Sequence, residues 1–311
     1  MKVIIPYDFG VMDLVSSSIP ETDHPEWSAS ATYSRGDFVI SVLTHTVYRS
    51  LTDNNSGNDP DIEQAALADP LIDDPATVHW QVIGATNRWR MFDKKPSVQA
   101  RADGSIEVVI HPNRFATGIG GFNLDAARVS VEVVDNGVLE YSRTVALSDE
   151  TVVGDWFSYF FTPILPLKEF ALTDLPPFAS ADLKVTIEGG GSIGVGQIVI
   201  GEVREIGSAG IGNTGFNGFD FSLVQQDEFG DLTTVRRAAT RLSTFDVFLS
   251  SYALSSFDSL MRDLRGGTAA VWIGDDDSRK AALNYGFYRD YRVIYTTAEY
   301  SVVSLQIQGI V

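Results

Sequence analysis

Residues 127–147 read ARVSVEVVDNGVLEYSRTVAL, and this stretch decides the fold class. Two runs rich in β-branched residues flank Asp135-Asn136-Gly137. An Asn-Gly pair favours the positive φ angles of a two-residue hairpin turn. Apolar and polar residues alternate in the runs, which gives each strand one face for a core. We therefore predict a β-hairpin here and a mainly β protein.

Similar runs continue on both sides of the hairpin. They are separated by Gly, Asn, Asp and Pro, and they read SIEVVI (105–110), WFSYFF (156–161), DLKVTIEG (182–189) and GQIVIGEV (196–203). Several short strands at regular spacing are typical of a β-sandwich or jelly roll. We assign residues 89–205 to such a domain.

The last third of the chain, residues 206–311, contains one clear helical pattern. Phe257, Leu260, Met261 and Leu264 follow at helical spacing. Ser255 or Ser256 is positioned to cap the start, and a Gly-Gly pair at 266–267 ends the pattern. Strand-like runs flank it, so we predict a C-terminal antiparallel α+β domain with one helix near 255–265.

Length, charge and composition limit the remaining possibilities. The 311 residues favour two or three domains, preceded by an N-terminal arm or linker over 1–24. Twenty-three basic against 41 acidic residues give a net charge of −18, which argues against nucleic-acid binding. The absence of cysteine excludes disulfides and thiol chemistry. No apolar run is long enough for a membrane span, and the N-terminus is unlike a signal peptide.

One glycine motif imitates a dinucleotide-binding fingerprint. Gly210, Gly212 and Gly215 lie in GIGNTG, but the residues that follow, FNGFDFSLV, form a strand-like run. The fingerprint requires a helix there, whose N-terminus holds the pyrophosphate. We interpret the motif as a connector between domains.

Acidic and histidine residues supply no defined reaction centre. The segment Asp53–Asp59 partly resembles a calcium loop, with Asn58 where such a loop needs glycine, so a calcium site and a solvated loop both stay open. Asp275–Asp277 fit an exposed turn. The four histidines show no zinc-type pairing. We predict no metal, no cofactor and no enzyme, although 41 carboxylates leave a glycoside hydrolase open as an alternative.

A pattern of aromatic residues marks residues 25–88. It comprises Trp27, Tyr33, Gly36, Asp37, Val39, Tyr48 and Trp80. This pattern resembles the small chitin-type carbohydrate-binding module of bacterial chitinases, which implies a compact three-stranded β unit. The resemblance makes Trp27, Tyr33, Tyr48 and Trp80 candidate carbohydrate contacts. The same four rings also suit the core of so small a unit. The exposed aromatic pair that the family carries after its second tyrosine is missing from Arg49–Thr52.

The rest of the chain resembles tail proteins of long-tailed, siphovirus-like bacteriophages. Residues 84–93, GATNRWRMFD, are similar to the junction that opens a jelly-roll domain in tail-tip and baseplate components. Residues 89–205 resemble a galactose-binding-like sandwich, and 206–311 resemble the closing domain. The resemblance implies a virion structural protein of the tail tip or baseplate, made in the host bacterial cytoplasm. By analogy with that sandwich, Asn113, Arg114 and Trp156 are loop residues for ligand contact.

The resemblance also implies partners. These are other tail or baseplate proteins, further copies of the chain in a three- or sixfold ring, and a cell-surface glycan in an accessory attachment role. The alternative is a lectin-like protein or an accessory module of a polysaccharide-degrading enzyme. Two segments are candidate assembly contacts: MKVIIPYDFG (1–10), as an edge strand added to a neighbour, and the polar insert 53–76, as a contact loop.

Overall fold

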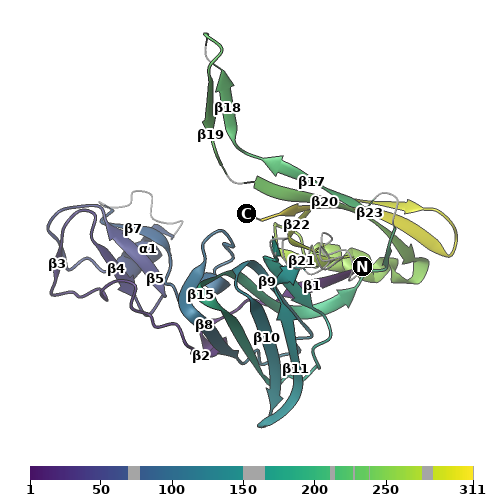
Figure 1. Cartoon of the computed structure of the whole chain (residues 1–311), viewed down its shortest axis with the longest axis horizontal. Coiled ribbons are helices and arrows are strands. Elements are labelled where there is room, and N and C mark those ends of the chain that lie inside the picture. The colour runs from purple at the N-terminus through teal and green to yellow at the C-terminus, as the bar shows by residue number, and fades with distance from the viewer. Residues whose placement is uncertain are drawn as a thin grey trace, which may run out of the picture.

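The computed structural model of the chain describes residues 1–68, 78–149, 165–210, 214–226, 228–237, 239–274 and 283–310. It confirms the mainly β class, with a large antiparallel sheet and a helix near the C-terminus. Figure 1 shows how the parts are arranged. The run predicted as a strand over 156–161 and the acidic residues 275–277 lie outside the described residues.

One sheet of 14 strands runs through the described part of the chain. Its strands are β1 (Lys2–Pro6), β2 (Leu14–Ser17), β8 (Ala100–Ile110), β9 (Gly118–Asp125), β10 (Arg128–Asp135), β11 (Val138–Ala146), β14 (Glu169–Leu172), β15 (Asp182–Glu205), β16 (Ser208–Ala209), β17 (Gly215–Asp220), β20 (Ala239–Ser250), β21 (Ala270–Ile273), β22 (Leu283–Tyr295) and β23 (Tyr300–Gly309). Along the main path their order is β11-β10-β15-β1-β21-β22-β23-β20-β16. Shorter elements are η1 (Val11–Asp13), η2 (Arg90–Phe92), η4 (Ser251–Ala253), β12 (Ser148–Asp149) and β13 (Leu165–Pro166).

The predicted hairpin is present. Asp135 pairs with Val138, so Asn136 and Gly137 alone form the turn between β10 and β11. Their φ angles are 48° and 81°, as a type I′ turn requires. The local sequence therefore sets both the turn and the register of this edge of the sheet.

Strand β15 holds the middle part of the chain together. Its first part pairs with β10 and β8, and its last part pairs with β9 and β1. The register shifts between Glu188 and Ser192. Ile106, Val131 and Val185, from three of these strands, are fully buried in one shared core. The galactose-binding-like assignment of this region stays a prediction.

The N-terminal segment is not a free edge strand, so that prediction is wrong. β1 lies between β15 and β21 and pairs with both. Val3 is buried in the C-terminal core, whereas Ile4 is buried in a separate cluster with Phe122 and Val271. Because both of its edges and both of its faces are occupied, β1 joins the middle and C-terminal parts of the same chain.

The C-terminal part contains the predicted helix, α3 (Leu254–Asp263). Phe257, Leu260 and Met261 pack it onto one face of the sheet formed by β20 to β23. The predicted serine cap is wrong. The helix continues from η4, and its N-cap, Ala253, makes no side-chain hydrogen bond.

Residues 25–85 form the small unit, in which β4 (Phe38–Ser41), β5 (Thr46–Ser50) and β7 (Trp80–Ala85) make a three-stranded antiparallel sheet. A second pair joins β3 (Thr32–Tyr33) to β6 (Asn55–Ser56). The described part of the polar insert is not only a loop, because it contains helix α1 (Pro60–Leu67). Asp59 caps this helix by accepting hydrogen bonds from the amides of residues 61 and 62.

The GATNRWRMFD segment fastens the small unit to the rest of the chain. The Asn87 side chain exchanges two hydrogen bonds of 2.8 Å with the backbone of Arg101. The Arg88 guanidinium donates to the carbonyl of Ile19 at 2.8 Å. Trp89 stacks on His45 with ring centroids 4.3 Å apart. The motif thus has a structural role, because its side chains join the small unit to Ile19 and Arg101 elsewhere in the chain.

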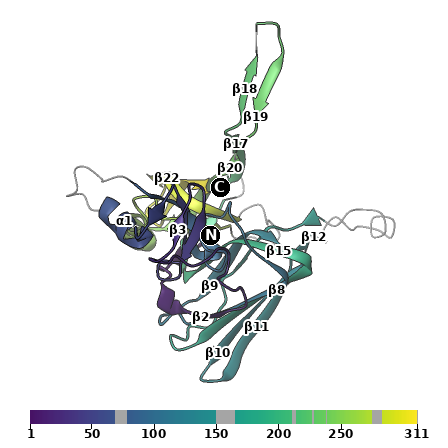
Figure 2. The same cartoon turned by 90° about the vertical axis from the view of Figure 1, so that its left-hand side faces the viewer.

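A hairpin extends away from the body in both views of the molecule (Figures 1 and 2). Its base is the pairing of β17 with the start of β20, and its outer part is β18 (Leu223–Gln226) paired with β19 (Leu232–Val235). We call these elements the projecting hairpin. A strand follows Gly215, as predicted, so the glycine motif lacks the helix that a dinucleotide site needs.

Candidate functional site

The four candidate carbohydrate contacts lie in or beside the core of the small unit. Trp80 and Tyr48 are only 1% and 3% exposed, and Trp27 and Tyr33 pack against them. The Trp80 indole donates to the carbonyl of Asn58 at 2.8 Å, and the Tyr33 ring meets the Trp80 ring edge-on at 5.3 Å. The structure therefore brings the four together as a packed cluster. Their carbohydrate role stays a prediction.

The Tyr48 hydroxyl is already used inside the unit. It donates to Asp61 on α1 at 2.9 Å, and Thr44 donates to the same carboxylate at 2.7 Å. Burial raises the pKa of Tyr48, and the bond to Asp61 adds to the rise. The phenol is thus a neutral group that holds α1 against the sheet.

Phe38 is the exposed aromatic side chain that sequence reasoning missed on this unit. His24 stacks on its ring at 5.1 Å, and the Arg49 guanidinium lies 5.8 Å from its centroid. These neighbours leave less of the ring open to a sugar. The sequence FVIS of β4 gives no signal for this exposure, because Phe38 is exposed although the three residues after it are buried.

Acidic side chains of the 53–59 segment are occupied by local hydrogen bonds. Asp53 accepts from the amide of Arg35 at 3.0 Å, Asn58 donates to Asn55 at 2.8 Å, and Asp59 caps α1. Among the described residues, no group of three or more His, Asp or Glu side chains could hold a metal ion. The loop interpretation of this segment is the better supported one.

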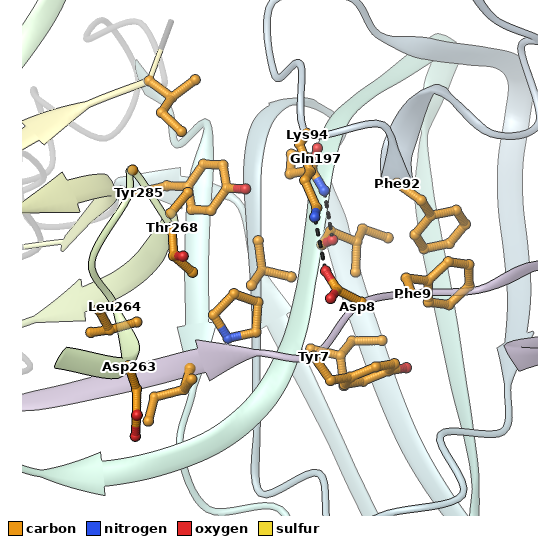
Figure 3. A pocket seen from close by; sticks show the side chains of 18 of the residues that line it. Tyr7, Asp8, Phe9, Phe92, Lys94, Gln197, Asp263, Leu264, Thr268 and Tyr285 are labelled. Atoms are coloured by element: carbon orange, nitrogen blue, oxygen red, sulfur yellow. Dashed lines mark hydrogen bonds and ion pairs between the residues drawn. The ribbon is translucent and has the colours of Figure 1, made fainter. Parts of the chain in front are cut away.

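A cleft with polar and aromatic side chains lies between β1, β15 and the loop that follows α3 (Figure 3). Its volume is about 550 Å³. The side chains labelled there come from five separate parts of the sequence: Tyr7, Asp8, Phe9, Phe92, Lys94, Gln197, Asp263, Leu264, Thr268 and Tyr285. This cleft could not be predicted from sequence, because several long-range strand pairings, β1 with β15 and β21 and β21 with β22, bring these segments together.

The cleft holds polar groups but no reactive pair among the described residues. The Lys94 ammonium lies 3.0 Å from the Asp8 carboxylate. Burial raises the pKa of Tyr285 to about 12, and Asp93 adds to the rise, so the phenol is neutral at pH 7. The buried Gln197 amide oxygen lacks a partner within the described part of the chain.

The remaining candidates are also placed. Arg114 lies over the Tyr7 ring at 5.0 Å, Asn113 adopts a φ of 53° in its loop, and Trp156 lies outside the described residues. Three histidines form pairs with acids, which are His45 with Glu21, His79 with Glu63 and His111 with Asp182. The three pairs lie in different parts of the chain and do not form one site.

The projecting hairpin carries the largest run of exposed apolar residues. Phe219 is 56% exposed and Leu232 is 67% exposed. Six more large apolar side chains on it are exposed: Phe216, Phe221, Leu223, Val224, Phe229 and Val235. An apolar surface of this extent on a soluble domain marks an interaction site.

The root of the projecting hairpin is fixed to the body by Arg241 on β20. Its guanidinium lies 3.3 Å from Glu169 on β14, donates to the carbonyl of Leu283 at 2.9 Å, and sits 5.2 Å from the Phe216 ring. Burial raises the pKa of Glu169, and Arg241 opposes that rise. One side chain thus joins three parts of the chain where the hairpin leaves the body.

Replacing Arg241 by methionine should lower the free energy of unfolding by about 1–2 kcal/mol at pH 7. The loss is moderate because the Arg241–Glu169 ion pair is partly exposed. Without the guanidinium the pKa of Glu169 rises further. Between the ordinary pKa of a glutamate and this raised pKa, Glu169 is protonated in the folded state and ionised in the unfolded state. The free energy of unfolding of the variant therefore falls as pH rises through this range. Urea unfolding should show a smaller cost below about pH 4, where both states are protonated. Glu169→Gln combined with Arg241→Met should restore most of the loss. An equal cost at both pH values would contradict this account.

Comparison with protein families, with curated proteins and with solved structures found no match to the chain. Within the described residues, no helix is both long and apolar enough to cross a membrane. The projecting hairpin is therefore the feature on which a function can be argued.

Proposed function

We propose that the chain is a structural subunit of a multiprotein assembly, a phage tail tip or baseplate, and that it contacts neighbouring subunits through the projecting hairpin. The observation that carries the proposal is the exposure of this hairpin. All residues of β17, β18 and β19 are exposed, including phenylalanines on β17 and a leucine and a valine on each of β18 and β19.

The size of this surface suits a specific protein interface. A buried phenylalanine covers about 150–250 Å², so the eight exposed apolar side chains, each roughly half exposed or more, offer on the order of 800 Å². One partner of a standard-size interface contributes about 800 Å². The outer edges of β18 and β19 also have no strand paired to them within the described residues. Such edges add main-chain hydrogen bonds to a contact or, left open, promote aggregation.

The choice of a phage tail rests on the resemblance of residues 84–93 and of the domain order. The structure supports a role through shape, because the contacts of that motif clamp two domains rather than line a reaction centre. A subunit of this kind needs rigid domains and exposed contact elements. The projecting hairpin is such an exposed element.

The direct test is the protein content of purified phage particles. Mass spectrometry should find the chain at a fixed copy number per particle, and antibody labelling should place it at the distal end of the tail. A phage lacking the chain should regain tailed particles when the wild-type chain is supplied. If the purified particles do not contain the chain, the proposal is wrong.

A further inference from the structure

The cleft of Figure 3 contains a buried amide with an unused hydrogen-bond acceptor. Gln197 on β15 is only 3% exposed. Its Nε2 donates to the carbonyl of Ile198 at 3.0 Å, whereas its Oε1 has no partner among the described residues. Exchanging the two atoms would not help, because it would set two acceptor oxygens against each other and leave an N–H unpaired. The cleft therefore offers an acceptor to a donor that the described part of the chain does not supply.

The surroundings of this amide are apolar. Gln197 lies opposite Phe122 in the pairing of β15 with β9, so the two side chains share one face of the sheet. Val199, two residues further along β15, lies on that face as well. Phe122 and Val199 belong to the same buried cluster as Tyr285. An unpaired polar atom in such surroundings is unfavourable, and a native core rarely keeps one without a bound molecule or a function to explain it.

A second polar group faces the same space. Tyr285 on β22 lies across the cleft from Gln197, and its hydroxyl is directed into the cleft (Figure 3). The ring is held in place by stacking on Phe122, with centroids 5.1 Å apart. Because burial raises the pKa of Tyr285 to about 12, its hydroxyl stays protonated at pH 7 and can donate as well as accept a hydrogen bond.

The cleft is large enough for a small organic molecule. Its volume of about 550 Å³ lies within the range of about 300–1,000 Å³ that is usual for ligand sites. Gly266 and Gly267 border it from the loop after α3, and a β-carbon added to either would meet no atom within 4 Å. That loop thus borders open space. The walls are fixed in advance, because β1 pairs with β15 on one side and with β21, which follows the loop, on the other.

The charges at the cleft favour an uncharged ligand. Asp8 and Lys94 lie 3.0 Å apart and neutralise each other. The Asp263 side chain points away from Gln197 and Tyr285 (Figure 3). The two groups that face the interior are therefore a neutral amide and a neutral phenol. A ligand with a net charge would lose its hydration there without gaining a counter-ion, which is unfavourable.

We propose that this cleft binds a small uncharged organic molecule that carries an N–H or O–H donor on an apolar body. The donor pairs with Oε1 of Gln197, the Tyr285 hydroxyl bonds to a second polar atom of the ligand, and the apolar body lies against Ile5 and Ala269, which also line the cleft. This site is separate from the projecting hairpin and adds a ligand to a chain whose proposed role is in assembly.

Benzamide is the probe, because it carries an amide donor on a flat apolar ring. Ligand-observed NMR with the purified full-length chain, at up to about 10 mM benzamide, covers the Kd of about 1 mM that suits so small a molecule. Methyl benzoate keeps the ring and the carbonyl but has no donor, so it should bind about tenfold more weakly, the effect of one hydrogen bond. The benzamidinium cation keeps the shape and the donors but is charged, and it should also bind about tenfold more weakly.

Gln197→Leu removes the acceptor and keeps a side chain of similar size. The affinity for benzamide should fall about tenfold while the affinity for methyl benzoate stays the same, so that the variant no longer distinguishes the two probes. Without a probe its Tm should not fall below that of the wild type, because an apolar group replaces an unpaired buried acceptor.

A second variant keeps the test decisive if Gln197→Leu does not fold. Thr268 is an exposed residue at the cleft, so Thr268→Phe should fill the space without disturbing the core and should abolish binding of both probes. Thr234→Phe, at an exposed threonine on β19, is the matched control and should leave binding unchanged.

Four results would overturn the site: benzamide that does not bind at about 10 mM, methyl benzoate or benzamidinium that binds as tightly as benzamide, benzamide binding that survives Thr268→Phe, or benzamide affinity that is unchanged in Gln197→Leu. The last result would mean that the amide pairs only with a bound water. The particle test of the proposed function is independent, because a chain that is absent from phage particles can still bind benzamide, and a tail subunit can fail to.

Discussion

Replacing Trp80 by alanine should lower the stability of the small unit by about 3–5 kcal/mol, the usual cost of removing a buried large aromatic side chain. The cluster around Trp80 has few other members, namely the buried Val39 and Tyr48, with Trp27 and Tyr33 at its edge. The change also removes the hydrogen bond from the Trp80 indole to the carbonyl of Asn58. We therefore expect residues 25–85 to unfold locally, visible as faster amide hydrogen exchange there, while the remainder of the chain keeps its protection.

Trp27→Phe is the matched control. It keeps an aromatic ring at the edge of the same cluster and removes an indole N–H that has no hydrogen-bond partner within the described part of the chain. Losing an unpaired buried donor costs little, so this variant should stay within about 1 kcal/mol of the wild type. If Trp80→Ala instead leaves exchange unchanged and abolishes binding to chitin oligomers, the ring acts in carbohydrate binding rather than in the core.

Local signals in the sequence predicted the parts of the fold that short segments determine. The Asn136-Gly137 turn needs only residues that accept positive φ, and the α3 pattern needs only helical spacing of Phe257, Leu260 and Met261. Helix α1 was missed, although Asp59-Pro60 is a good start signal, because the polar residues around it are also typical of a loop.

The position of β1 could not be predicted from local signals. Its residues read as a strand at an exposed end of the chain, and nothing in five residues reports that β15 and β21 lie on either side. The same limit applies to the candidate site. The sequence 216–224 predicts a strand with apolar residues, which is equally typical of a buried strand. Its exposure follows from tertiary contacts, since only the base of the projecting hairpin pairs with the body.

Deleting residues 1–6 should unfold the C-terminal part of the chain, contrary to the expectation that the N-terminus serves only assembly. The deletion leaves the edges of β15 and β21 unpaired and opens two cores at once, through the loss of Val3 and Ile4. Each lost aliphatic core side chain costs about 2–4 kcal/mol, which together approaches the total stability of an ordinary domain. Thermal unfolding followed by circular dichroism should show a transition that is lowered or absent. Limited proteolysis should locate the unfolded part within residues 206–311.

A point change at the same junction separates the role of β1 from the effects of truncation. A β-carbon added at Gly201 on β15 would lie 1.9 Å from the carbonyl oxygen of Ile5, so Gly201→Ala must push β1 away from its partner. Gly190 lies on the same strand with nothing within 4 Å of such an atom. We expect Gly201→Ala to lower the free energy of unfolding by about 3 kcal/mol or more, and Gly190→Ala to lower it by less than about 1 kcal/mol. Equal unfolding midpoints in urea for the two variants would show that β1 does not hold the two parts of the chain together.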